Sequence, residues 1–138
     1  MKGSGTRFVL NESTILFYRL RPVEACKDLL NCKLNWFQRI CIRAMWFKSY
    51  SMLIFGRGCG KTKLLAIFGV LKAMLYPNLK VGVLGPVKKQ GDFIFNEVEF
   101  LYNNSAFFRA SSIKHVSRTP ERNIVKFYNG SFLESTPI

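Results

Sequence analysis

The residues with the clearest chemistry in this sequence form a glycine-rich segment that ends in a lysine and a threonine. Residues 55–62, FGRGCGKT, match the end of the GxxxxGK[ST] phosphate-binding pattern, although Phe55 stands where the pattern has its first glycine. Glycines let backbone N–H groups approach a phosphate closely, and a helix starting at Lys61 would direct its N-terminus, worth about half a positive charge, at the same group. The segment therefore predicts a phosphate-binding loop.

The side chains of this loop have separate expected roles. Lys61 would reach the β- and γ-phosphates of a nucleotide, and Thr62 would hold Mg²⁺ through its hydroxyl. Arg57 would lie near the γ-phosphate or pair with a carboxylate, and the other interpretation is a solvent-facing loop arginine. We take Lys61 and Arg57 as candidate catalytic residues. The candidate nucleotide-binding residues of the loop are Gly56, Arg57, Gly58, Cys59, Gly60, Lys61 and Thr62.

A second candidate contact to the nucleotide lies upstream of the loop, at Phe37 and Gln38. A glutamine amide carries donors and an acceptor, so Gln38 can read the edge of an adenine. The neighbouring Phe37 can stack on the base. Aromatic residues at helical spacing usually belong to a core, which is the other interpretation of this pair.

The elements that must position these residues follow from periodicity, capping and turn signals. We expect an α/β fold: a partial RecA-like P-loop NTPase sheet of parallel strands with right-handed crossovers, flanking helices and a C-terminal β-hairpin. Asn129-Gly130 predicts a type I′ turn in that hairpin. The expected segments are an extended arm over 1–15, helices over 22–30, 35–47, 61–76 and 88–102, buried strands over 51–55 and 80–85, an irregular stretch over 103–120, and hairpin strands over 123–128 and 131–135.

Composition limits the class of protein. A chain of 138 residues fits one domain, and 21 Lys and Arg against 8 Asp and Glu give a net charge of +13. Such a charge favours a polyanionic partner, with an ordinary basic surface as the other interpretation. No pair of its 4 cysteines has metal-site spacing, so we expect reduced thiols and no zinc. The apolar run over 64–71 is too short for a membrane span and no secretory signal is visible, so we expect no membrane contact.

Taken in order along the chain, these motifs resemble the N-terminal ATPase region of the large terminase subunit of tailed bacteriophages. Residues 34–40, LNWFQRI, resemble the adenine motif of that family. Residues 55–62 resemble its variant Walker A motif, with Arg57 at the position of an expected arginine. Residues 80–86, KVGVLGP, resemble the strand that follows, and residues 129–131, NGS, resemble the hairpin before Walker B. The ordered set covers nearly the whole chain and is more specific than any one motif.

The resemblance implies a hydrolase that uses ATP and Mg²⁺ to move double-stranded DNA into a procapsid. It also implies a portal partner, a small terminase subunit and the remainder of the large subunit, including a C-terminal nuclease domain. The expected location is the host cytoplasm, at the portal of the procapsid during assembly.

One motif of the family is missing from this sequence. Walker B needs an apolar strand that ends in aspartate followed by a catalytic glutamate. Neither Asp28 nor Asp92 ends such a strand, and Glu134 has no aspartate beside it. We therefore expect a single, truncated ATPase domain, with an N-terminal arm and adenine-motif helices over 1–50 and a P-loop core over 51–138. Without a general base, we expect weak ATP binding and negligible turnover by this chain alone.

Two other functions remain open on the sequence. A helicase-like P-loop ATPase also carries a glutamine motif upstream of its phosphate loop. A non-catalytic basic module that binds DNA or an assembly partner would account for the charge and for the missing Walker B motif.

Overall fold

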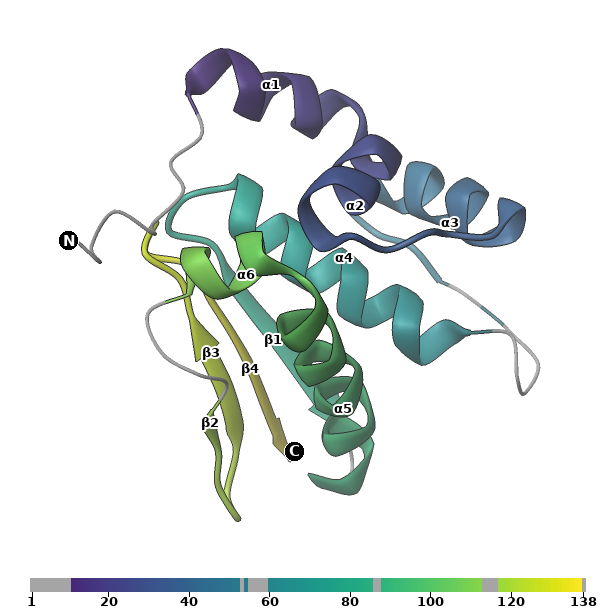
Figure 1. Ribbon diagram of the computed structural model, residues 1–138. Coiled ribbons are helices and arrows are strands. Elements are labelled where there is room, and N and C mark those ends of the chain that lie inside the picture. Colours follow the sequence, from purple (N-terminus) through teal and green to yellow (C-terminus); the bar gives the residue numbers. More distant parts are fainter. Residues whose placement is uncertain (1–10, 53, 55–59, 86–87, 113–116, 138) are drawn as a thin grey trace, which may run out of the picture.

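The computed structural model is a mixed α/β fold, and it describes residues 11–52, 54, 60–85, 88–112 and 117–137 (Figure 1). The helices predicted from periodicity are present with small changes at their ends. The elements in chain order are α1 (Glu12–Leu20), α2 (Pro22–Leu30), α3 (Trp36–Trp46), α4 (Lys61–Leu75), β1 (Lys80–Gly85), α5 (Lys88–Asn104), α6 (Ala106–Ser111), β2 (Ser117–Arg118), β3 (Asn123–Lys126) and β4 (Phe132–Pro137).

The strands form a four-stranded sheet in the order β1-β4-β3-β2. Strands β1 and β4 are parallel, with Lys80 opposite Phe132 and Gly85 opposite Pro137. Strand β3 is antiparallel to β4 and also to β2. The sheet is therefore mixed, whereas the sequence predicted a parallel sheet and a C-terminal β-hairpin. Here the hairpin supplies β4, the strand that pairs with β1.

Helix α4 lies between the sheet and the N-terminal helices, and it carries much of the core. Helices α4 and α5 pack on one face of the sheet, and α2 and α3 pack on the outer side of α4 (Figure 1). Gly69 lets α4 approach the sheet closely, because a Cβ there would lie 3.3 Å from Leu133 and 3.5 Å from Val81. The buried residues of α4 are Leu64, Ala66, Ile67, Gly69, Val70, Leu71, Ala73 and Leu75.

Both strands predicted to be buried differ from expectation. In the described part of 51–55 no strand is present, and the side chains of Met52 and Ile54 are 86% and 88% exposed. Strand β1 is present, but its burial alternates and Leu84 is 68% exposed. The reason is that helices cover only one face of β1, so its short apolar run is half-buried rather than enclosed. No described helix is long and apolar enough to cross a membrane.

The N-terminal arm predicted over 1–15 is partly wrong, since α1 begins at Glu12, while residues 1–10 lie outside the described part. The side chain of Asn11 caps this helix by accepting a hydrogen bond from the Thr14 N–H at 2.8 Å. Contacts from Arg19 then attach α1 to the rest of the molecule. Its carbonyl accepts a bond from the Trp46 indole at 2.7 Å, and its Nε donates to the Leu75 carbonyl at 2.9 Å.

The hairpin turn between β3 and β4 is present, but it is not the predicted type I′. That type needs positive φ at both central residues. Among the described residues only Asn31 and Asn78 have positive φ without being glycine, so Asn129 does not. The N–H of Gly130, whose φ is 88°, donates to the Phe127 carbonyl at 3.1 Å, as in a type I turn followed by a glycine bulge.

The side chain of Asn129 explains this turn, because it caps the end of α4. Its Nδ2 donates to the carbonyls of Ala73, Met74 and Tyr76 at 2.9, 3.2 and 3.4 Å. Its Oδ1 accepts the N–H of Ser131 at 3.0 Å. The hairpin tip is thereby fixed to a helix more than fifty residues away in sequence.

We expect Asn129→Ala to lower the free energy of unfolding by about 1–3 kcal/mol, because it leaves carbonyls at the end of α4 without a donor. Urea unfolding followed by circular dichroism measures this. The matched control is Asn104→Ala, since the exposed Asn104 amide donates only to Phe100 of its own helix, and we expect a change within about 0.5 kcal/mol. Equal losses in both variants would contradict this role of Asn129.

Candidate functional site

The first turn of α4 is where the structure positions the end of the glycine-rich segment. Gly60 is the N-cap of α4 with φ 76° and ψ 24°, and no side chain caps this end. The first backbone bond of the helix joins the Leu64 N–H to the Gly60 carbonyl at 3.0 Å. The N–H groups of Lys61, Thr62 and Lys63 precede that bond, so the helix itself offers them no acceptor.

The charge of this turn is the opposite of what a helix start favours. Its sequence is Lys61-Thr62-Lys63, with no acidic residue. Each cation near a helix N-terminus is unfavourable by roughly 0.3–1 kcal/mol, since anions and not cations are stabilised there. The Lys61 residue is exposed and Thr62 is half-buried. This end of α4 is thus an uncapped, positively charged group of donors, suited chemically to an anion.

The start of α3 holds Gln38 through a capping box. The Gln38 N–H donates to Oδ1 of Asn35 at 2.8 Å, and Oε1 of Gln38 accepts the Asn35 N–H at 3.2 Å. The Gln38 residue is only 6% exposed. Because Oε1 is engaged in the box, Nε2 is the group that Gln38 directs away from α3.

That amide nitrogen lies against Gly60. A Cβ built on Gly60 would be 2.7 Å from Nε2 of Gln38, closer than side chains normally approach. The structure therefore brings together two residues that the sequence linked to one nucleotide, separated by more than twenty positions. It also gives Gln38 a role that the sequence did not indicate, since its amide fills the space that a side chain at residue 60 would take.

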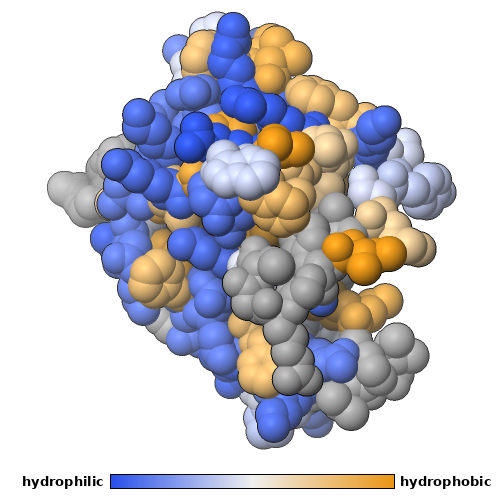
Figure 2. Space-filling view, turned by 90° about the vertical axis from the view of Figure 1, so that its right-hand side faces the viewer, coloured by the Kyte–Doolittle hydropathy of each residue, from blue (hydrophilic) through white to orange (hydrophobic). Residues whose placement is uncertain are grey.

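The aromatic residues before Gln38 are arranged differently from one another. Phe37 is half-buried, packs against the hydrophobic core and meets Trp36 edge-on at 5.9 Å. Trp36 is 70% exposed and Ile40 is 55% exposed, next to the exposed Arg39. Figure 2, which views the molecule from this side, shows hydrophilic and hydrophobic residues interspersed. Of the two rings, Trp36 has more surface available to a ligand.

The topology places the start of α4 at one end of the sheet, where the parallel strands terminate. Helix α4 leads through a short connection into β1, so its first turn lies toward the carboxyl end of β1 (Figure 1). The carboxyl end of the parallel strand β4 lies at the same end of the sheet. In open α/β sheets, ligands bind beyond the carboxyl ends of the strands.

Several predicted site residues lie outside the described part of the chain, namely Phe55, Gly56, Arg57, Gly58 and Cys59. Of the metal candidates, Thr62 places a hydroxyl in the first turn of α4. The described residues contain no cluster of three or more His, Cys, Asp or Glu side chains that could hold a metal.

The carboxylates near the sheet have structural partners. Asp92 accepts a hydrogen bond from the Asn123 amide at 2.7 Å and lies 3.7 Å from Arg118. Glu134 pairs with Arg122 at 3.2 Å. Both carboxylates therefore take part in contacts between elements of the fold.

Sequence reasoning missed Lys63 and Cys32. Lys63 lies two residues after Lys61, and its positive charge lowers the pKa of the Cys32 thiol in the turn after α2. One signal in the sequence pointed to Lys63: it is the second lysine in a predicted first helical turn that contains no acidic residue. Nothing in the cysteine spacing indicated Cys32, because its neighbours come from another helix.

Comparison with known proteins assigns no family to this chain. No protein-family model matches it, and no curated protein matches it either. Its function must therefore be argued from its own motifs and geometry.

Proposed function

We propose that this chain is the nucleotide-binding part of a RecA-like P-loop ATPase of the terminase large-subunit type. One observation carries the proposal: the amide of Gln38 packs on Gly60 at an uncapped helix start that bears Lys61 and Thr62. Two lysines near the positive N-terminus of a helix are unfavourable when no anion is bound there. An anion bound there would offset that charge and accept hydrogen bonds from the N–H groups of the first turn, for which the helix itself offers no acceptor.

In this proposal each residue has a distinct task. The backbone N–H groups of Lys61 and Thr62 bind a phosphate of ATP, and the exposed Lys61 ammonium contacts the β- and γ-phosphates. Arg57 would lie near the γ-phosphate. Gln38 has two tasks. Its amide packs against Gly60, and its Nε2 can donate a hydrogen bond to a base that lies beside Phe37 or Trp36.

Magnesium, when bound, would neutralise charge on the phosphates, and the Thr62 hydroxyl is the described group that would hold it. The remaining loop glycines, Gly56 and Gly58, and Cys59 would contribute backbone N–H groups.

The biological setting is proposed from the resemblance and from the charge. A net charge of +13 favours contact with double-stranded DNA. The terminase interpretation adds ATP-driven DNA packaging at the portal of a procapsid in the host cytoplasm, together with a portal, a small terminase subunit and other parts of the large subunit.

Removing the Lys61 ammonium tests the proposal directly. We expect Lys61→Ala to weaken Mg²⁺-ATP binding roughly 10- to 100-fold, since a hydrogen bond to a charged group contributes about 1.5–3 kcal/mol. Isothermal titration calorimetry measures the affinity. Lys126→Ala, at an exposed position of β3, removes the same charge near the hairpin that contacts the carboxyl end of α4, at the opposite end of that helix from Lys61, and should leave the affinity unchanged. Salt-dependent DNA binding without any ATP binding in the wild type would favour the basic-module alternative.

A substitution at Gly60 tests the geometry of the loop. Gly60→Ala places a Cβ 2.7 Å from Gln38 Nε2 at a φ of 76°, so we expect a loss of about 1–2 kcal/mol in the free energy of unfolding and weaker ATP binding. Gly82→Ala is the control, because a Cβ there meets nothing within 4 Å. Urea unfolding and calorimetry measure both effects. Unchanged ATP affinity in Gly60→Ala would count against a nucleotide at this turn.

A further inference from the structure

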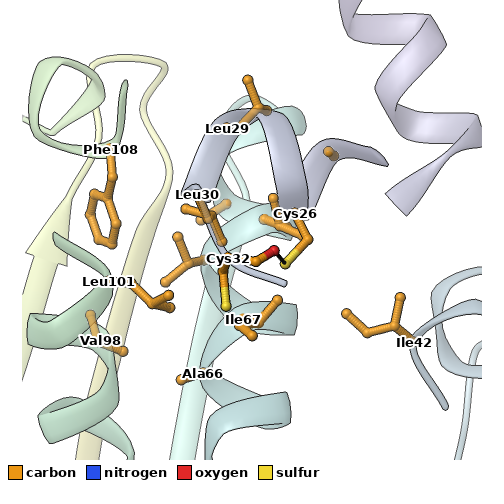
Figure 3. Packing of buried hydrophobic residues seen from close by; sticks show 14 of the residues in the cluster. Cys26, Leu29, Leu30, Cys32, Ile42, Ala66, Ile67, Val98, Leu101 and Phe108 are labelled. Atoms are coloured by element: carbon orange, nitrogen blue, oxygen red, sulfur yellow. Dashed lines mark hydrogen bonds between the residues drawn. The ribbon is translucent and has the colours of Figure 1, made fainter. Parts of the chain in front are cut away.

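Two cysteines lie next to each other where α2 ends. Cys26 is in the last turns of α2, and Asn31, with φ 50°, turns the chain so that Cys32 returns beside it. The Cys26 thiol donates a hydrogen bond to the Cys32 carbonyl at 3.4 Å (Figure 3). The Cys32 thiol in turn donates to the Lys33 carbonyl at 3.9 Å. The turn after α2 therefore holds the pair together before any reaction.

The two thiols differ in access to solvent. Cys26 is completely buried, whereas Cys32 is 9% exposed and lines a cavity of about 330 Å³ between α2 and the start of α3. Lys27, Lys33 and Arg39 also line this cavity, with Glu24 as its acidic residue. Cys32 therefore borders a cavity with a mostly positive lining, whereas Cys26 does not line it.

The charges around Cys32 favour its thiolate. Its pKa falls from an ordinary 9.0 to about 6, first through the hydrogen bond with Cys26 and then through the charge and hydrogen bond of Lys63. Burial and the carboxylate of Glu97 act in the opposite direction. The pKa of Cys26 is raised, first by its hydrogen bond with Cys32 and then by burial and by the Cys32 charge. Cys32 is therefore the member of the pair that ionises.

We propose that Cys32 is a peroxide-reactive thiol and that Cys26 is its resolving partner, so that this turn is a site of reversible oxidation. The Cys32 thiolate attacks a hydroperoxide, the O–O bond breaks, and the leaving oxygen takes up a proton from solvent, so the products are Cys32 sulfenic acid and water or an alcohol. The Cys26 sulfur then attacks the Cys32 sulfur, the S–O bond breaks, and water leaves. Two electrons pass from the thiol pair to the peroxide, and a Cys26–Cys32 disulfide remains.

This order of steps fits the arrangement of the pair. While Cys32 is a thiolate, its negative charge keeps the proton on Cys26. Conversion of Cys32 to the neutral sulfenic acid removes that charge, so Cys26 becomes easier to deprotonate at the moment when it must attack. A thiol reductant would restore both groups.

Thiol alkylation tests the first step without any substitution. With limiting iodoacetamide near neutral pH, we expect Cys32 to react roughly tenfold faster than Cys41, because the lowered pKa of Cys32 leaves it largely as the thiolate. Cys41 is the internal control, since it is 8% exposed and does not line this cavity. The Cys32 rate should be half-maximal near pH 6, in line with its lowered pKa. Equal rates for Cys32 and Cys41 would overturn the proposal.

Peroxide treatment tests the second step. After brief exposure to hydrogen peroxide, quenching and tryptic digestion, we expect a linked pair of peptides. Cleavage after Lys27 places Cys26 and Cys32 in separate peptides, so their disulfide is identified directly by mass. Dithiothreitol should release the two peptides. A pair that involves Cys41 or Cys59 instead, or no pair, would refute the assignment.

Single substitutions assign the roles of the two thiols. In Cys26→Ser the Cys32 sulfenic acid should persist and be trapped by dimedone, whereas Cys32→Ser should leave Cys26 unreacted. Cys41→Ser should form the Cys26–Cys32 disulfide like the wild type. Dimedone labelling of Cys26 in Cys32→Ser would reverse the roles, and the proposal would fail. The alkylation rates of the wild type remain decisive if a variant does not fold.

Discussion

The packing of α4 is the constraint on which the rest of this structure depends. One side of the helix meets the sheet, where Gly69 allows close contact with Leu133, and the other side meets α2 and α3. Enclosure on both sides explains why its sequence is apolar nearly throughout. Helix α4 therefore has little surface along its length at which to present chemistry. What it can offer to a ligand is concentrated at its two ends.

The two ends of α4 differ in how their backbone groups are capped. At the carboxyl end, side chains from two distant parts of the chain supply donors to the last carbonyls: Arg19 to Leu75, and Asn129 and Ser131 to Tyr76. At the amino end no side chain caps the helix, and lysines stand where carboxylates would be favourable. Because donors pair with the carbonyls at the carboxyl end, the N–H groups at the amino end are the backbone groups with which α4 can bind a ligand. The asymmetry is a physical reason, independent of any motif, to look for an anion at Gly60.

The sequence predicted the elements whose signals are local. Helix α2 begins at Pro22 and ends before Asn31, because proline is favoured in a first helical turn and Asn31 adopts a left-handed conformation. Elements that depend on distant contacts were not predictable in the same way. The apolar residues around Met52 resemble a buried strand, but burial is decided by what covers them. The hairpin turn was misassigned because Asn129 bonds to the end of α4, a contact that no turn preference contains.

The candidate site shows the same division between local pattern and distant contact. The Gly60-Lys61-Thr62 motif is local, and the structure starts a helix at Lys61 as predicted. Gln38 was singled out as a group that reads a base, yet its oxygen closes a capping box and its nitrogen packs on Gly60. A glutamine at this position can therefore be required for the backbone shape at Gly60 whether or not a base touches it. That coupling makes the entry of α3 part of the site, because a change in the Asn35 cap would move Gln38 and, with it, the space beside Gly60.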